Sequence, residues 1–348
     1  ITGGCGFIGS NFIINQINSS NNHILNFDVL SYAANPENLE EISTSDRYEF
    51  FKGDICNQNN VQSAINRFKP NAVIHFAAES HVDRSISNPN KFIKTNVNGT
   101  ANLLNICQKY YKELDSQEKK RFRFLHISTD EVFGSLGRKG SFNEKTSYNP
   151  NSPYSASKAS SDHLVRAWNH TYNFPTLITN CSNNYGPYQF PEKLIPLMIA
   201  NCFDRKPLPI YGKGDNIRDW LYVDDHCSAL NLVLNEGEIG NTYNIGGNSE
   251  VKNIDIVQSI CSLLDELKPL KNSKKYSSLM TFVQDRPGHD FRYAIDSTKI
   301  QKNLNWKPKE NFKTGLDKTV KWYIENETWW RKIQNLKYSQ ERLGLIDE

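Results

Sequence analysis

Short apolar runs alternate along the first half of the chain with longer segments whose apolar residues recur at helical spacing. The short runs predict strands over residues 24–28, 48–51, 72–76, 122–127 and 176–180. The segments between them predict helices over residues 9–17, 59–68, 90–112 and 153–172. Short apolar strands separated by helices are typical of a parallel sheet covered on both faces. The pattern therefore predicts an α/β fold.

The character of the sequence changes after about residue 180, where glycine and proline become dense and the alternation loosens. Such a segment suits a smaller domain beside the open edge of the sheet. Residues 220–234 and 242–247 again resemble elements of the first domain. We therefore predict an interleaved division. Residues 1–182 with about 220–247 form the sheet domain, and residues 183–219 with about 248–348 form a substrate-binding domain.

The composition argues against several functional classes. The net charge of +3 over 348 residues is small and spread out, so no nucleic-acid partner is expected. No apolar run approaches the roughly 20 residues that cross a bilayer, so no membrane contact is expected. The seven cysteines are scattered without a Cys-x-x-Cys pair, which favours reduced thiols in a cytoplasmic protein and argues against a metal. The chain opens inside an expected strand, so residues are expected upstream.

A glycine-rich turn stands at the start of the chain. Residues 4–9 (GCGFIG) match G-x-G-x-x-G, and Gly3, Gly6 and Gly9 also fit G-x-x-G-x-x-G. Such glycines allow a tight turn, close approach of the backbone to a pyrophosphate and close helix–strand packing. The motif alone is weak evidence, but a strand can end before it and a helix can continue over residues 11–17. In this context it predicts a Rossmann-type, doubly wound dinucleotide-binding domain.

Acidic residues at the ends of the next two strands extend this prediction. Asp28 ends the expected strand over residues 24–28, about 20 positions beyond Gly9. A carboxylate there can accept both ribose hydroxyls of adenosine and repels a 2′-phosphate, which favours NAD over NADP. A helix cap or turn acid is the structural alternative. Asp54 and Ile55 follow the third strand, where an adenine edge can be bound.

A tyrosine and a lysine four positions apart occur twice. Tyr48 and Lys52 fall in a strand-like run, where the two side chains lie far apart, so we interpret this pair as coincidence. Tyr154 and Lys158 follow a serine–proline helix start at residues 152–153, and on a helix they stack one turn apart. An ammonium near a phenol favours the phenolate, so Tyr154 can take a proton from an alcohol as its hydride leaves. Lys158 can also hold the ribose of a nicotinamide.

Two adjacent acids, Asp130 and Glu131, end the apolar run over residues 122–127. In isolation they fit a solvated turn equally well. Between a dinucleotide loop and a Tyr/Lys pair they indicate an acid and a base that remove water. The sequence therefore favours oxidation followed by dehydration.

With these motifs in order, the chain resembles the extended short-chain dehydrogenase/reductase superfamily and, within it, the dTDP-glucose 4,6-dehydratases. The likeness covers nearly the whole chain. It rests on the strings at residues 77–85 (AAESHVDRS), 129–132 (TDEV), 180–196 (NCSNNYGPYQFPEKLIP), 218–225 (RDWLYVDD) and 285–290 (DRPGHD). Phe133 stands where the family has tyrosine, and we expect this to change packing only.

The resemblance implies a reaction on a glucose nucleotide, dTDP-glucose or alternatively UDP-glucose. NAD takes the C4 hydride while Tyr154 accepts the O4 proton, and Thr129 orients O4. Glu131 then removes the C5 proton, Asp130 protonates the departing C6 hydroxyl, and the hydride returns to C6. The two acids must then hold opposite protonation states.

The resemblance also implies the binding residues. For the cofactor these are Gly3, Gly6, Phe7, Ile8, Gly9, Asp28, Ser31, Asp54, Ile55, Ala77, Ala78, Ser80, Thr95, Tyr154, Lys158 and Asn184. For the substrate they are Ser80, Thr129, Asn183, Glu192, Lys193, Arg218, Asn253, Arg286 and His289, the last with a turn residue as its alternative. The cations suit the diphosphate, since a guanidinium matches phosphate oxygens.

The resemblance also bears on the oligomeric state and on two alternative functions. Relatives pair through helices corresponding to residues 90–112 and 154–172, so we expect a homodimer. A sugar-nucleotide epimerase or decarboxylase on the same scaffold is the nearest alternative, and the acid pair argues against it. A catalytically silent NAD-binding regulator is a second alternative, and the retained Tyr154 and Lys158 argue against it.

Overall fold

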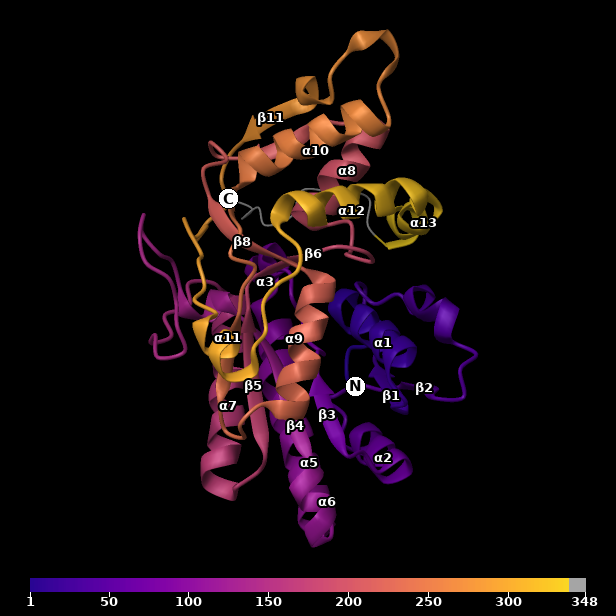
Figure 1. Cartoon of the computed structure of the whole chain (residues 1–348), viewed down its shortest axis with the longest axis vertical. Coiled ribbons are helices and arrows are strands. Elements are labelled where there is room, and N and C mark those ends of the chain that lie inside the picture. Colours follow the sequence, from indigo (N-terminus) through magenta and orange to yellow (C-terminus); the bar gives the residue numbers. More distant parts are fainter. Residues whose placement is uncertain (338–348) are drawn as a thin grey trace.

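A parallel sheet forms the lower part of the computed structural model, which describes residues 1–337 (Figure 1). Its strands are β1 Ile24–Asp28, β2 Tyr48–Lys52, β3 Ala72–His75, β4 Arg123–Thr129, β5 Thr176–Cys181 and β9 Thr242–Ile245. Strands β3, β4, β5 and β9 pair in that order, and β1 pairs with β2. Thr2 forms parallel bridges to both Phe27 and His75, so the start of the chain joins the two groups into one layer. The α/β prediction of a doubly wound parallel sheet is confirmed.

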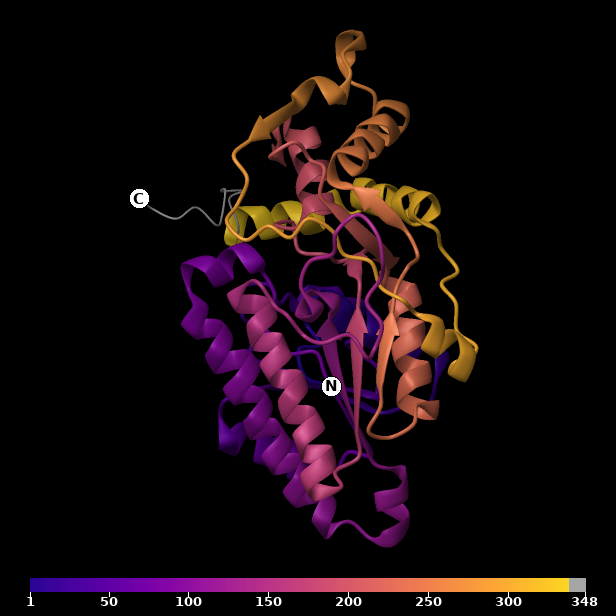
Figure 2. The ribbon, with the colours of Figure 1, turned by 90° about the vertical axis from the view of Figure 1, so that its left-hand side faces the viewer.

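Helices cover both faces of this sheet. The larger ones are α1 Phe7–Ser19, α2 Gln58–Phe68, α5 Thr100–Glu113, α7 Pro153–Tyr172 and α9 Val223–Glu236. Shorter helices are α3 Val82–Ser87, α4 Pro89–Phe92, α6 Ser116–Arg121 and α11 Thr298–Leu304. Helices α5 and α7 run side by side on one face (Figure 2), and α9 lies on the other beside α1 (Figure 1).

The alternation of side chains along the strands explains the two layers. Successive residues of a strand point to opposite faces of the sheet. Ile74, Leu125 and Leu177 accordingly pack with Phe12 of α1 and Leu230 of α9. Their sequence neighbours Val73, Phe124 and Ile178 point to the other face, where they pack with α2, α5 and α7. Each strand is therefore buried on both sides.

A smaller unit sits above the carboxyl ends of the strands. Its strands are β6 Asn183–Tyr185, β7 Leu208–Tyr211, β8 Ile217–Tyr222, β10 Glu250–Lys252 and β11 Met280–Val283. Its helices are α8 Leu194–Asp204, α10 Asn253–Leu267, α12 Phe312–Glu325 and α13 Glu327–Lys337. They enclose a separate core around Tyr185, Ile256 and the fully buried Trp330. The division of the chain into domains stays a prediction, and β8 itself pairs with β6 and β10 of the smaller unit.

The segment predicted as one helix over residues 90–112 contains an irregularity. After α4 the chain forms a π-helical turn over residues 93–99 before α5 begins. Asn96 lies in this turn and is buried, with its amide donating to the carbonyl of Glu79 at 3.0 Å and to the hydroxyl of Ser157 at 2.9 Å. Such turns often occur at functional sites. Within residues 1–337, no helix combines the length and the apolar character needed to span a membrane.

Candidate active site

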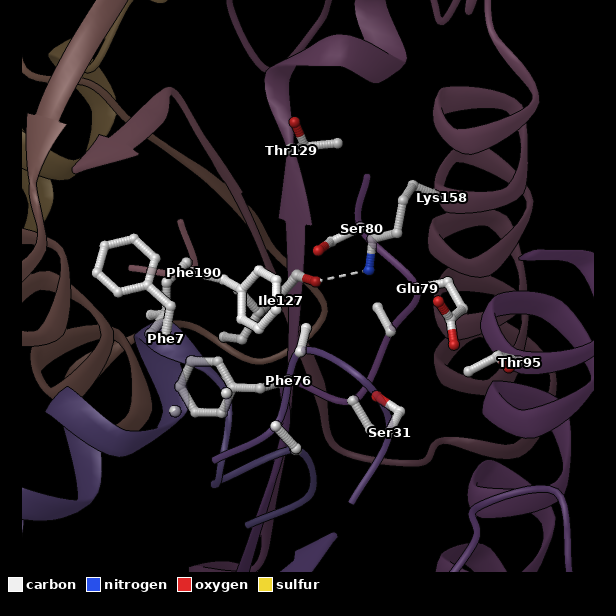
Figure 3. Close-up of a pocket in the computed structure, with 18 of the residues that line it drawn as sticks. Phe7, Ser31, Phe76, Glu79, Ser80, Thr95, Ile127, Thr129, Lys158 and Phe190 are labelled. Carbon is white, nitrogen blue, oxygen red and sulfur yellow. Dashed lines mark hydrogen bonds between the residues drawn. The ribbon is translucent and has the colours of Figure 1, made fainter. Parts of the chain in front are cut away.

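A cavity of about 560 Å³ opens at the carboxyl ends of β1, β4 and β5, where open α/β sheets bind ligands (Figure 3). Its wall contains every residue predicted to contact the cofactor. Thr129 stands at the end of β4, and Lys158 reaches into the cavity from α7 (Figure 3). The cavity also reaches the smaller unit, through residues 183–193. It is therefore shaped for a ligand that spans both units.

The glycine turn forms one end of the cavity. A Cβ atom on Gly9 would lie 2.5 Å from the carbonyl oxygen of Gly3, and one on Gly3 would lie 2.6 Å from the nitrogen of Ala77. Gly3 also has a φ of +74°, which other residues rarely adopt. Gly6 precedes α1 and offers no side-chain cap, so the first N–H groups of the helix remain available to an anion. The turn fits a dinucleotide pyrophosphate.

Asp28 lies at the end of β1, on the wall of the same cavity. Its carboxylate accepts hydrogen bonds from the backbone N–H groups of Cys5 at 2.9 Å and Leu30 at 2.8 Å. These contacts fix its position, and carboxylate oxygens have further lone pairs with which to accept from ribose hydroxyls. Asp54 is fixed similarly by the N–H of Cys56 at 2.8 Å. Both predicted carboxylates are thus held by backbone contacts at the cavity.

The acid pair lies in a short 3₁₀ turn over Asp130–Phe133, directly after β4. The hydroxyl of Thr129 caps this turn by accepting a hydrogen bond from the N–H of Glu131 at 3.3 Å. Asp130 is only 1 % exposed, and its Oδ2 atom has no hydrogen-bond partner among the described residues. Phe133 is buried and stacks on Phe142, which agrees with a packing role.

The two acids differ in their surroundings. Burial, followed by the charge of Glu131, raises the pKa of Asp130 well above its ordinary value. Burial also raises the pKa of Glu131, but Arg286, Lys193 and Arg218 oppose this effect. Asp130 is therefore the member of the pair that stays protonated and has a proton to give, and Glu131 is the group that ionises more readily. This is the division of roles that an acid and a base require.

Tyr154 and Lys158 lie in the first two turns of α7. Ser152 caps this helix in a capping box, with Pro153 in the first turn, as the sequence predicts. Both side chains are buried, and the ammonium of Lys158 donates to the carbonyl of Ile127 at 2.8 Å (Figure 3). Burial, followed by the charge of Glu131, raises the pKa of Tyr154 well above its ordinary value. In the chain alone Tyr154 is therefore a phenol, and burial outweighs the expected effect of Lys158.

Three cations approach the acid pair from the side of the smaller unit. Lys193 lines the cavity and donates to the carbonyl of Ser80 at 3.0 Å. Among the described residues that form the cavity wall, Arg218 and Arg286 are absent. Their charges nevertheless act to lower the pKa of Glu131, which burial raises. Arg218 stacks on an aromatic ring, with its guanidinium carbon 4.3 Å from the ring centre of Tyr293.

The remaining predicted substrate residues occupy different places. Asn183 lines the cavity, and its Oδ1 atom is buried without a partner among the described residues. Asn253 begins α10 and lies outside the cavity wall. Its Oδ1 atom is likewise buried without a hydrogen-bond partner among the described residues. His289 also lies outside the wall formed by the described residues, and it is held by Asp285 at 2.6 Å as in its turn alternative. Glu192 lines the cavity but is already engaged by other side chains.

Sequence reasoning missed the residues that engage Glu192. Tyr32 donates to its carboxylate at 2.9 Å, and Arg84 lies 2.9 Å from its other oxygen. The guanidinium of Arg84 also lies 4.0 Å from the ring centre of Tyr32. Glu79 and Lys91 form a further ion pair of 2.9 Å at the cavity wall. Arg84 and Glu79 lie within the family-like string at residues 77–85, so that string was the available signal.

Residues 1–319 match the family model described as GDP-mannose 4,6 dehydratase. The chain is 54 % identical to a probable dTDP-glucose 4,6-dehydratase of Sinorhizobium fredii, over 100 % of this chain and 99 % of that protein. It is 54 % identical to the dTDP-glucose 4,6-dehydratase of Neisseria meningitidis, over 99 % and 98 % of the two chains. The dTDP-glucose 4,6-dehydratase DesIV of Streptomyces venezuelae, solved with NAD and TDP bound, is similar with a TM-score of 0.86 and 42 % identity, over 95 % and 98 %.

Proposed function

Because this chain belongs to the 4,6-dehydratase family and its curated relatives are dTDP-glucose 4,6-dehydratases, we propose that it is an NAD-dependent hydro-lyase acting on dTDP-glucose. The product is the 4-keto-6-deoxy sugar nucleotide, an intermediate for deoxysugar synthesis. One observation supports this most strongly. A hydride-transfer pair, Tyr154 and Lys158, shares a cavity with two acids, Asp130 and Glu131, whose pKa values are set differently.

The residues around the cavity fit NAD. The uncapped start of α1 suits the pyrophosphate, and Asp28 suits the adenosine ribose. Lys158 lines the same cavity, which supports a role in holding the nicotinamide ribose. Bound there, NAD would supply the hydride acceptor for C4 and, once reduced, the hydride donor for C6. The solved relatives that contain NAD support this cofactor.

In the oxidation step, the chain handles one proton. Tyr154 accepts the O4 proton as the C4 hydride leaves, and its buried setting keeps water from competing. Thr129 hydrogen-bonds O4 and orients the sugar. Burial raises the pKa of Tyr154, and its side-chain hydrogen bond with Thr129 acts in the opposite direction, toward the phenolate that this role requires.

In the elimination step, the acids act on neighbouring carbons. The new C4 ketone acidifies the C5 hydrogen, which Glu131 removes as a proton. Asp130 delivers a proton to the C6 hydroxyl, which departs as water with the electrons of its C–O bond. A C5=C6 double bond results, and it accepts the returning hydride at C6 and a proton at C5. Asp130 is suited to this role because its raised pKa keeps it protonated.

The diphosphate of the substrate is neutralised by Lys193, Arg218 and Arg286. Arginine and lysine bind phosphate oxygens through charge-assisted hydrogen bonds. Asn183 lines the cavity, and its buried Oδ1 atom has no partner among the described residues, which supports a contact with the substrate. The TDP bound in the Streptomyces venezuelae relative supports thymidine over uridine.

The test is incubation with dTDP-glucose and NAD, followed by mass spectrometry of the sugar nucleotide. Loss of one water supports the proposal. An isomer of unchanged mass would instead indicate an epimerase, and absence of turnover a regulator. A parallel titration with UDP-glucose tests the nucleobase, and we expect the thymidine substrate to have the higher kcat/KM.

We also propose a homodimer in a reducing, cytoplasmic setting. Helices α5 and α7 form one exposed face, which Ile93 and Tyr172 flank as exposed apolar side chains. The seven cysteines are free thiols. Sedimentation at micromolar concentration should give twice the mass of the chain, and a single species of monomer mass would contradict the dimer.

A further inference from the structure

A polar cluster is buried beneath the cavity, between α7 and the sheet. Asp162 of α7 is fully buried at its centre. One of its carboxylate oxygens accepts hydrogen bonds from Ser128 at 2.9 Å, Tyr148 at 2.8 Å and Asn180 at 3.2 Å. Nε2 of His126 lies 3.2 Å from the other oxygen. Donors from two strands and a loop thus converge on one carboxylate that the proposed reaction does not use.

This cluster is connected to the parts of the active site. Asp162 follows Lys158 by one helical turn, so the two side chains are neighbours on α7. The amide of Asn180 donates both to Asp162 and, at 3.0 Å, to the carbonyl of Thr129. Ser128, which also donates to Asp162, directly precedes Thr129 in β4. The carboxylate therefore fastens the end of β4 to the helix that carries Tyr154 and Lys158.

The charge of Asp162 affects the protonation of Lys158. Burial lowers the pKa of Lys158, and Asp162 is the largest influence that raises it again. Burial raises the pKa of Asp162 as well, but His126, Lys158 and Tyr148 outweigh this and hold it below its ordinary value. Asp162 is therefore an anion beside a buried ammonium.

Other titratable groups around Lys158 are neutral. They come from three strands and from α7 itself: His75 on β3, His126 on β4, Cys181 on β5 and Tyr154 on α7. Burial lowers the pKa of both imidazoles, to about 4 for His126. Burial raises the pKa of the thiol and of the phenol. Of these groups and Asp162, all of them within the described residues, Asp162 is the one that carries a negative charge.

We propose that Asp162 is a positioning residue that keeps Lys158 in its ammonium form and aligns the end of β4 with α7. This deepens the proposed function, on which its catalytic meaning rests. Through Lys158 the carboxylate supports ionisation of Tyr154, and through Asn180 and Ser128 it places Thr129 and the acid pair. Asp162 itself does not touch the reacting atoms.

The test compares two substitutions of buried aspartates, Asp162→Asn and Asp225→Asn. Asp225 lies on α9, where its carboxylate accepts from the N–H groups of Lys309 and Glu310, away from the cavity wall. Without the anion, Lys158 should lose its proton at lower pH. For Asp162→Asn we expect the alkaline limb of kcat/KM to move down by about one pH unit or more, the usual effect of a close opposite charge. Asp225→Asn should keep the wild-type limb, and an unchanged limb in Asp162→Asn would overturn the proposal.

A second measurement covers the case in which Asp162→Asn is too unstable for a pH profile of turnover to be measured. Removing one partner of a buried ion pair strands the other charge, whereas removing both does not. The double variant Lys158→Met/Asp162→Asn should therefore melt at a higher temperature than Asp162→Asn alone. If the double variant is no more stable than Asp162→Asn, the pairing is disproved. This cycle needs no turnover, so its result is independent of whether wild-type protein dehydrates dTDP-glucose.

Discussion

The ammonium of Lys158 donates a hydrogen bond of 2.8 Å to the carbonyl of Ile127, two residues before Thr129 (Figure 3). This bond crosses from α7 to β4 and fixes the register of the two elements at the cavity. Tyr154 lies one turn before Lys158, and Asp130 follows Thr129 directly. This contact and the hydrogen bonds that converge on Asp162 therefore hold the residues proposed for hydride transfer against those proposed for loss of water.

Tyr154→Phe tests the proton acceptor. The substitution removes the phenol oxygen from a buried position, so oxidation at C4 should slow by about 10² to 10⁴, the usual contribution of a general acid–base group. Single-turnover measurement of nicotinamide reduction gives this rate. Tyr276→Phe is the matched control, because Tyr276 is also buried but donates to the carbonyl of Lys268 in the smaller unit. A loss below tenfold in Tyr154→Phe would place the base elsewhere.

Glu131→Gln tests the base of the elimination step. A neutral amide cannot remove the C5 proton, but the C4 oxidation by Tyr154 does not need Glu131. We expect reduced cofactor to accumulate in a single turnover, while the yield of dehydrated product falls by about 10² or more. Glu118→Gln, in an exposed capping box, should behave as wild type. Normal product formation by Glu131→Gln would show that Glu131 is not the base of the elimination step.

Asp130→Asn separates activity from stability. The folded pKa of Asp130 lies above its unfolded value, so ionisation of Asp130 does not reduce stability below the ordinary carboxyl range but reduces it as pH rises from there through the folded pKa. Asp130→Asn should therefore gain thermal stability over wild type as pH increases, and it should lose dehydration at every pH. Melting curves across pH check this. If Asp130→Asn and wild type had equal melting temperatures at all pH values, Asp130 would not be held neutral by the fold.

Much of the fold follows from local sequence signals, and the site shows where such signals end. The start of α7 at Pro153 was predictable because a serine cap and a first-turn proline are local features. The π turn that carries Asn96 was not, because one extra residue per turn leaves the apolar pattern of residues 90–112 almost unchanged. The short strands β6, β7 and β10 lie among glycines and prolines, and their pairing depends on distant partners.

Long-range ion pairs in particular have no local signal. Arg84 and Glu192 are 108 positions apart, and Arg286 and Asp83 are 203 positions apart. Both arginines stood in family-like strings, which indicated that they matter but not what they contact. Asp162 lay in no quoted motif, and only the fold brings its donors together.

Arg84→Met tests the pair with Glu192. The Glu192 side chain is 1 % exposed, so removing Arg84 leaves a buried carboxylate short of a partner. We expect the free energy of unfolding to fall by about 1–3 kcal/mol. Arg67→Met removes a solvent-exposed pair with Glu49 and should cost about 0–1 kcal/mol. Urea unfolding of both variants gives the comparison, and equal losses would mean that the Arg84 contact contributes no more than a surface pair.

In the proposed reaction, hydrogen taken from C4 is returned to C6 after water is lost. The most direct measurement uses dTDP-glucose carrying deuterium at C4, with the product analysed by mass spectrometry and NMR. We predict a dehydrated product that retains the deuterium at C6. A product that keeps deuterium at C4, or one that has lost the label without gaining it at C6, would contradict the account.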